Sequence, residues 1–178
     1  MKRVFAAAAI LLIAATSVAQ AQEKASAANA SATGMSALLG MVKGNILKAA
    51  EQVPEEKYSY QPTKEVRTLG ALLAHIADAQ TFFCSQLTAS PKDYSDATEK
   101  GAKTKAEIIS ALTKSFEACD AAYGAVTDAE LSKPLNIFGN KTNVAGAMTF
   151  NTAHDWEHYG NIVTYMRMLG MVPPSSQQ

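Results

Sequence analysis

The chain has 178 residues, and its 16 lysine and arginine residues balance its 16 aspartate and glutamate residues, which gives a formal net charge of zero. Apolar residues make up 48% of the chain, enough for a sizeable core in one domain. No stretch is rich in lysine and arginine, so the sequence offers no basic surface and we expect no nucleic-acid partner.

Residues 1–21 have the pattern of a secretory signal peptide. Lys2 and Arg3 precede an apolar run, and Ala19-Gln20-Ala21 is a typical cleavage site. The run is shorter than the roughly 20 residues of a membrane span, so a retained N-terminal anchor is the weaker alternative. We therefore expect an exported protein, periplasmic or extracellular, that starts at Gln22 and has no membrane contact after cleavage.

The beginning of the mature chain is predicted to contain a leader and one helix. Residues 22–32 are small and polar without an apolar period, and we expect a flexible leader. From Met35, apolar residues recur at intervals of three and four, which predicts an amphipathic helix ending near Val53-Pro54. Residues 54–66 form a connector, ordered if Tyr58 and Tyr60 pack on the core.

Two further helices are predicted in the middle of the chain. Thr68 is a good N-cap for the second, on which His75 points to the same side as the apolar residues. Residues 89–103 form a polar loop that is long for a hairpin between neighbouring helices. Thr104 and Glu107 then have the spacing of a capping box, which starts a third helix ending near Val126.

The last part of the chain is predicted to hold a small hairpin and a fourth helix. The hairpin turns at Gly139-Asn140-Lys141, and the helix runs from about Val144 to Leu169. Gly170 and the prolines after it terminate the helix. Four helices with few strand signals predict an all-α four-helix bundle over residues 33–174, with residues 175–178 as a tail.

All three histidines of the chain fall on predicted helices. His154 and His158 are four residues apart, one turn and about 6 Å along a helix, so their imidazoles can reach one ion. A third ligand from another helix, His75, would leave one position open, as in catalytic zinc sites. The alternative is that all three are polar residues on core-facing helices.

The segment His154-Asp155-Trp156-Glu157-His158 loosely resembles the HExxH helix of zinc proteases, with an aspartate where their general-base glutamate stands. Those enzymes take a third ligand from downstream, usually histidine or glutamate. Because the sequence has no His, Asp, Glu or Cys after His158, the protease site cannot be completed in that way.

Two stretches carry a family resemblance: TLGALLAHIADAQTFF on the second helix and HDWEHYGNIVTYMRMLGMVPPS on the last. Together they resemble the DinB/YfiT-like family of metalloenzymes, over nearly the whole mature chain. The resemblance implies an up-down-down-up four-helix bundle with a divalent metal, most often zinc or nickel, on His75, His154 and His158. Activities in this family include thiol-dependent transfer and proposed hydrolysis.

The helix order implied by the resemblance bears on Cys84 and Cys119. In parallel second and third helices the two cysteines would lie at nearly the same height and could form a disulfide. In an antiparallel hairpin they would be offset by roughly 16 Å and could not. The disulfide is thus a hypothesis that depends on the parallel order, and two buried thiols are the default expectation.

A metal on three neutral imidazoles could activate either water or a thiol, so hydrolase and thiol transferase share the same ligands. Asp155 and Glu157 flank the ligands and are candidates for proton transfer, and Tyr159 for lining the open side; a solvated helix face is the alternative. Export disfavours cytoplasmic thiol cofactors and favours either hydrolysis of a small molecule or a metal-binding role without turnover. A non-catalytic metal-binding stress or envelope protein is the other function class, and a homodimer is among the expected assemblies.

Overall fold

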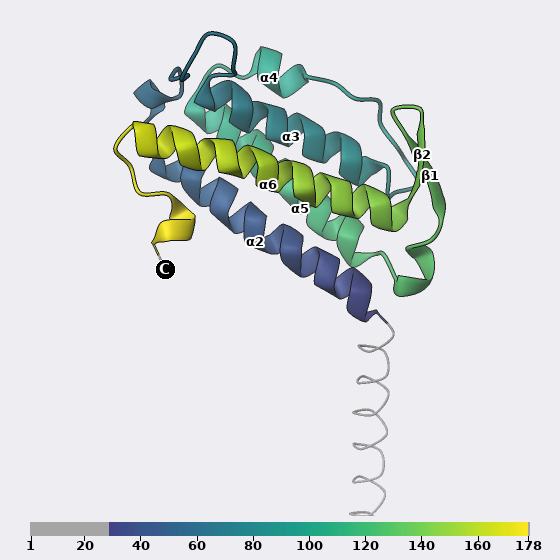
Figure 1. Cartoon of the computed structure of the whole chain (residues 1–178). Helices are drawn as coiled ribbons and strands as arrows, with labels where there is room; N and C mark the ends of the chain where they lie inside the picture. The colour runs from purple at the N-terminus through teal and green to yellow at the C-terminus, as the bar shows by residue number, and fades with distance from the viewer. Residues whose placement is uncertain (1–28, 178) are drawn as a thin grey trace, which may run out of the picture.

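The computed structural model describes residues 29–177, in which four long helices lie side by side (Figure 1). They confirm the predicted four-helix bundle. The predicted signal peptide and residues 22–28 lie outside the described residues. The long helices are α2 (Ala30–Gln52), α3 (Leu69–Ser85), α5 (Lys105–Gly124) and α6 (Val144–Met168). The short elements are η1 (Glu55–Lys57), α4 (Ala97–Gly101), η2 (Asp128–Glu130), the antiparallel strands β1 (Pro134–Ile137) and β2 (Asn140–Asn143), and η3 (Pro174–Ser176).

Contacts between helix ends give the helix directions. The Lys105 ammonium group donates to the carbonyl oxygens of Glu51 and Val53, each at 2.6 Å, so α5 begins where α2 ends. The Tyr165 hydroxyl donates to the carbonyl oxygen of Arg67 at 3.1 Å, so α6 ends where α3 begins. Tyr58 joins the end of α2 to the start of α3, because its hydroxyl donates to the Ala50 carbonyl oxygen at 2.7 Å and its carbonyl oxygen accepts from the Gly70 N–H at 2.8 Å. Helices α3 and α5 thus begin at the same end of the bundle and are parallel, and the up-down-down-up order is confirmed.

Cys84 of α3 and Cys119 of α5 form a disulfide, with their Cα atoms 5.0 Å apart. Both cysteines are buried. The parallel order of the two helices places them at the same height, as the disulfide hypothesis required. The alternative expectation of two free thiols is wrong.

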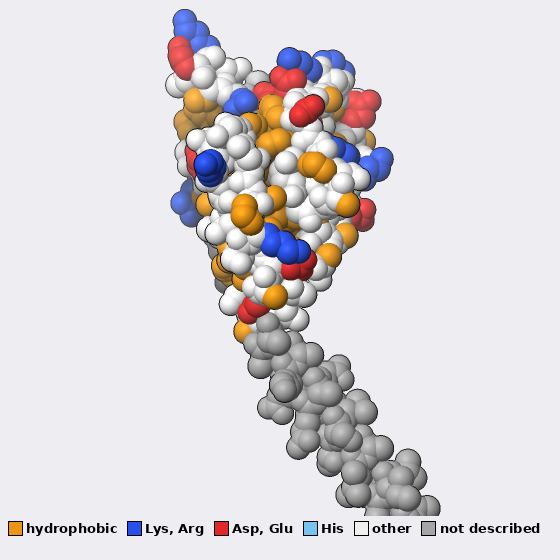
Figure 2. Space-filling view, turned by 90° about the vertical axis from the view of Figure 1, so that its right-hand side faces the viewer, with side chains coloured by type: hydrophobic (Ala, Val, Ile, Leu, Met, Phe, Trp, Pro, Cys, Tyr) orange, Lys and Arg blue, Asp and Glu red, His pale blue; other side chains and the backbone are white. Residues whose placement is uncertain are grey.

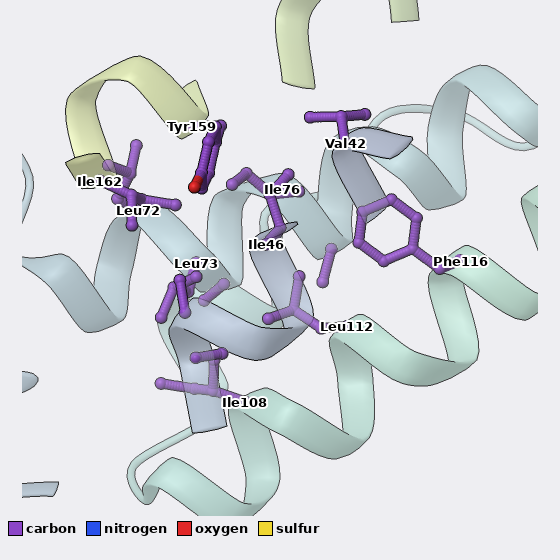
Figure 3. Close-up of a cluster of buried hydrophobic side chains, with 14 of the residues drawn as sticks. Val42, Ile46, Leu72, Leu73, Ile76, Ile108, Leu112, Phe116, Tyr159 and Ile162 are labelled. Carbon is purple, nitrogen blue, oxygen red and sulfur yellow. The ribbon is translucent and has the colours of Figure 1, made fainter. Parts of the chain in front are cut away.

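The core lies between the four helices, where each contributes one stripe of apolar side chains. Figure 3 shows these side chains pointing toward one another: Val42 and Ile46 of α2, Leu72, Leu73 and Ile76 of α3, Ile108, Leu112 and Phe116 of α5, and Tyr159 and Ile162 of α6. Full burial of one such side chain stabilises the fold by roughly 1.5–3 kcal/mol. This packing fixes α3 against α6, the two helices that carry the histidines.

The helix starts and stops that were predicted from local sequence are confirmed. The Thr68 side chain accepts from the backbone N–H of Ala71, and Thr104 and Glu107 form a reciprocal capping box. Gly170 follows α6 with a φ of 73°, the left-handed conformation that suits glycine after a helix end. Helix α5 ends at Gly124, two residues before the predicted end, a normal difference for a helix boundary.

Helix α2 begins at Ala30, five residues before the predicted start at Met35. The Asp128 carboxylate, from η2, accepts from the backbone N–H groups of Ser31 at 3.1 Å and Ala32 at 2.8 Å. Residues 30–32 of the predicted leader are thus helical, because a distant carboxylate caps them. The hydrogen bonds from Ala32 and Ser31 hold the pKa of Asp128 below its usual value.

The two long connections are more ordered than their polar composition indicates. Tyr58 is buried and donates its hydroxyl hydrogen to the carbonyl oxygen of Ala50 at 2.7 Å, which confirms the ordered connector before α3. The predicted polar loop contains α4. The buried Asp78 carboxylate of α3 accepts from the backbone N–H groups of Thr98 and Glu99 and so holds α4 over α3.

The molecular surface carries charges of both signs. On the face in Figure 2, lysine and arginine side chains are intermingled with aspartate, glutamate and apolar side chains. Among the described residues, none of the helices combines the length and apolar character needed to cross a bilayer.

Candidate metal centre

The three histidines converge between α3 and α6. His75 lies in the middle of α3, and His154 and His158 occupy adjacent turns of α6 on the side that faces α3. The Nε2 atom of His154 lies 3.3 Å from Nε2 of His75 and 2.9 Å from Nε2 of His158. One nitrogen from each of the three rings lies within 4.8 Å of the others. The predicted three-histidine cluster is present.

This spacing fits one small divalent ion. Zinc binds histidine nitrogen at about 2.0–2.1 Å in tetrahedral sites, which separates neighbouring nitrogens by roughly 3.3 Å. The two closest distances around His154 lie near this value. Unprotonated ring nitrogens that face one another repel unless they share a cation, so the donor set suits a metal.

Burial keeps the three imidazoles neutral. It lowers the pKa of His154 to about 4, with a further contribution from His158 and His75. Burial also lowers the pKa of His158 to about 4, helped by His75 and the Arg67 charge, and it lowers that of His75. Neutral histidine is the form that binds metals, so the set is ready to bind at neutral pH without losing protons.

Polar contacts orient the His75 ring. Its Nδ1 atom lies 3.3 Å from the Tyr94 hydroxyl oxygen and 3.6 Å from Oε2 of Glu99. A proton on Nδ1 therefore has acceptors, which leaves the Nε2 lone pair directed at the other histidines. Glu99 and Tyr94 both come from the connection between α3 and α5.

Aromatic packing positions the His154 ring. The Phe150 ring stacks with it at a centroid distance of 6.4 Å, and the Phe83 ring lies at 5.9 Å. Within the described part of the chain, the buried Nδ1 atoms of His154 and His158 have no hydrogen-bond partner. These two rings are thus held by packing and by their place on α6 rather than by acceptors.

A cleft of about 570 Å³ opens beside the cluster at His158. Arg67 and Glu99 lie in its wall, where Arg67 Nε donates to Glu99 Oε1 at 2.8 Å. The cleft is lined by Glu65, Val66, Arg67, Leu72, Glu99, His158, Asn161 and Tyr165. A small molecule in this cleft would contact the one histidine that opens to it.

The three residues predicted to take part in catalysis do not lie together. Asp155 is fully buried in the bundle, where it accepts from the Gln80 amide and where burial raises its pKa well above the usual value. Glu157 is exposed, and Tyr159 is buried with its hydroxyl accepting from the backbone N–H of Ser175. None of the three is among the described residues that line the cleft. Their catalytic roles stay predictions.

Sequence reasoning missed Arg67, Tyr94 and Glu99. Tyr94 and Glu99 lie in a polar segment with no periodic pattern, and Arg67 directly precedes an N-cap. The folding of that segment over α3 brings Tyr94 and Glu99 to His75, and Glu99 in turn meets Arg67. Their local sequence carries no signal for this, because each contacts a residue that lies 19 or more positions away along the chain.

The comparison with known families agrees with this geometry. A family model described as the DinB superfamily matches residues 39–162, which include all three histidines. The chain belongs to the DinB superfamily. No curated protein matches this DinB-superfamily chain.

Solved structures share the fold of this DinB-superfamily protein at low sequence identity. A DinB-like protein from Bacillus subtilis has a TM-score of 0.65 at 20% identity, covering 82% of this chain and 98% of its own. YfiT from Bacillus subtilis has a TM-score of 0.63 at 14% identity, and the match covers 79% of this chain and 88% of YfiT. YfiT is described as a probable metal-dependent hydrolase with an unusual four-helix bundle topology. A mycothiol-dependent maleylpyruvate isomerase has a TM-score of 0.63 at 12% identity, with 74% of this chain matching 60% of that one.

Proposed function

We propose that this protein is a metal-dependent hydrolase in which His75, His154 and His158 bind one divalent ion, Zn²⁺ or Ni²⁺. The observation that carries the proposal is the convergence of three neutral imidazoles, one nitrogen from each within 4.8 Å of the others, beside an open cleft. The description of YfiT as a probable metal-dependent hydrolase supports it.

The chemistry would divide between the ion and the chain. A divalent ion on neutral imidazoles lowers the pKa of bound water from 15.7 to about 7, which supplies a nucleophile at neutral pH. A proton on Nδ1 of His75 would face the Tyr94 hydroxyl oxygen at 3.3 Å and the Glu99 carboxylate at 3.6 Å, and this tautomer would keep Nε2 available for the ion. Leu72 and Val66 give the cleft an apolar wall on which a substrate can pack.

Thiol transfer is the second candidate activity, because the same ligand set can bind a thiol as thiolate. The name of the mycothiol-dependent isomerase favours it. The signal-peptide pattern at residues 1–21 favours hydrolysis, since low-molecular-weight thiol cofactors are cytoplasmic. A metal-binding protein without enzymatic activity would have the same three ligands. Only an activity assay distinguishes it from an enzyme.

We also propose that the protein is exported. The signal-peptide pattern motivates this, and the Cys84–Cys119 disulfide supports it, because disulfides persist in oxidising compartments and are rare in the cytosol. Mass mapping of protein isolated from its native cells would locate the mature N-terminus. A chain that keeps residues 1–21 would contradict cleavage.

Metal content and turnover test the proposed function together. We expect one Zn²⁺ or Ni²⁺ per purified chain by elemental analysis, and none in a variant with His75, His154 and His158 all replaced by alanine. In a screen of small esters and amides, His158→Ala should lower kcat/KM at least about 100-fold, and chelated wild type should regain activity on metal addition.

Two outcomes would count against it. If wild-type protein bound no more metal than the triple alanine variant, the three histidines would not form a metal site. Metal binding without turnover of esters, amides or thiol-transfer substrates would instead favour the non-catalytic class.

A further inference from the structure

We infer that the cleft beside the three histidines receives a small molecule with a carboxylate group, and that the guanidinium of Arg67 binds this carboxylate. The inference rests on the proposed function and names the substrate class of that site. It depends on three features of the cleft: the fixed position of Arg67, its unused donors and the balance of charge.

Arg67 is held at two points. The Tyr165 hydroxyl of α6 donates to its carbonyl oxygen at 3.1 Å, which fixes its backbone at the cleft edge. Its Nε donates to Glu99, whose own backbone N–H donates to the buried Asp78 carboxylate at 2.9 Å. A guanidinium that is already oriented loses little conformational entropy when it binds a ligand.

The outer edge of the same guanidinium is free for a ligand. Of its five N–H donors, only Nε–H forms a hydrogen bond within residues 29–177. The Arg67 side chain is 42% exposed and lines the cleft, and its Nη1 and Nη2 groups have no hydrogen-bond partner among the described residues. Two adjacent N–H groups of this kind match the two oxygens of a carboxylate.

The charge of the cleft favours an anion once a metal is bound. One guanidinium and two carboxylates, those of Glu65 and Glu99, line it, so its formal charge is −1 with neutral histidines and +1 with a divalent ion. A guanidinium near a cation site weakens metal binding by repulsion. That arrangement becomes favourable when a monoanion lies between the two positive charges.

The size of the cleft suits such a ligand. A volume of about 570 Å³ lies within the range of roughly 300–1,000 Å³ that small-molecule sites occupy. Val66 and Leu72 form the apolar part of the wall, while Asn161 and Tyr165 add polar groups. A carboxylate on a short hydrocarbon chain would meet both kinds of surface.

The test uses protein loaded with Co²⁺, whose visible spectrum reports binding without any assay of activity. The probes are the monohydroxamates of malonic, succinic and glutaric acid, each paired with its methyl ester. The hydroxamate binds the metal in every probe, and the free carboxylate is present in only one member of each pair. The three chain lengths vary how far the carboxylate reaches toward Arg67.

We expect the acid of the best-fitting pair to bind about tenfold more tightly than its ester, the gain from one partly exposed charge-assisted contact. Arg67→Gln should remove this preference, so that acid and ester bind that variant with equal affinity, and Arg67→Lys should keep part of the preference. The matched control is Arg167→Gln, which removes an arginine that bonds to Ser176 and does not line the cleft.

Three results would overturn the inference. In the first, no acid is preferred over its ester at any chain length. In the second, the preference persists in Arg67→Gln or is equally lost in Arg167→Gln. In the third, Co²⁺ gives no bound spectrum; this removes the metal site and the inference with it, whereas the first two leave the metal site intact.

Discussion

His75 differs from the other two histidines in how its ring is held. Its Nδ1 atom faces the Tyr94 hydroxyl and the Glu99 carboxylate, whereas His154 and His158 are positioned by packing. A carboxylate behind a ligand histidine fixes the tautomer and raises the basicity of the ligand nitrogen. Glu99 is therefore the side chain outside the cluster that we expect to contribute most to metal affinity.

Replacement of Glu99 by glutamine should weaken Zn²⁺ binding about tenfold, because His75 loses its charged acceptor. Competition with a chromophoric chelator measures this affinity. Glu65→Gln is the matched control, since Glu65 lines the same cleft and has no contact with His75 in the described structure. Equal losses in the two variants would assign the effect to the charge of the cleft instead of the contact.

At the scale of secondary structure, each long helix depends on the cap at its start. Helices α3, α5 and α6 are capped by side chains that directly precede them, Thr68, Thr104 and Asn143. Helix α2 instead takes its cap from Asp128, 96 residues from Ala32 along the chain. Its first turn is thus coupled to the docking of η2.

Thr104→Ala should lower the free energy of unfolding by about 1 kcal/mol, because it removes one half of the capping box of α5. Urea denaturation followed by circular dichroism measures the change. Thr113→Ala is the control within the same helix, where the hydroxyl only bonds back to the Ile109 carbonyl oxygen. A loss as large for Thr113 as for Thr104 would contradict a specific role for the cap.

The Asp128 cap should make the stability of the protein depend on pH. Because the pKa of Asp128 is lowered on folding, its contribution is complete above the unfolded value of about 4 and is lost as pH falls through the folded value. Asp128→Asn should lower Tm at pH 7, and the difference from wild type should shrink below about pH 4. A difference that stays constant down to pH 2 would contradict a role for the ionised carboxylate.

At the scale of the whole molecule, the parallel pairing of α3 and α5 is secured by a covalent bond. The Cys84–Cys119 disulfide links the two helices near their C-terminal ends across 35 residues. The chain between them passes over α3 and carries α4 with Glu99. The bond therefore joins the two ends of the segment that supplies the contacts to His75.

The double variant Cys84→Ala/Cys119→Ala should be about 2–4 kcal/mol less stable than wild type, because the unfolded chain is no longer cross-linked. Denaturant unfolding with and without a thiol reductant measures this. Reductant should destabilise wild type and leave the double variant unchanged. Two free thiols in mass mapping of native protein, with no effect of reductant, would contradict the disulfide.

Local sequence patterns predict the features that depend on residues a few positions apart. Apolar periodicity predicts the four helices, and the capping residues Thr68 and Thr104 predict where two of them begin. His154 and His158 share a face because they are one turn apart. Each of these follows from the geometry of a single helix, so no knowledge of packing is needed. The sequence offers His75 as a third ligand because it lies on the apolar side of another predicted helix, and the family resemblance supports that role and supplies the helix order.

Which distant groups meet depends on how the helices pack. His75 and His154 are 79 residues apart, and Ser31 and Asp128 are 97 apart, so their contacts exist only after the helices have packed in one order. The same packing brings Arg67 and Glu99 together at the cleft. Side-chain periodicity is set within one or two turns, whereas contacts between elements depend on the burial of the whole core, which no single segment specifies.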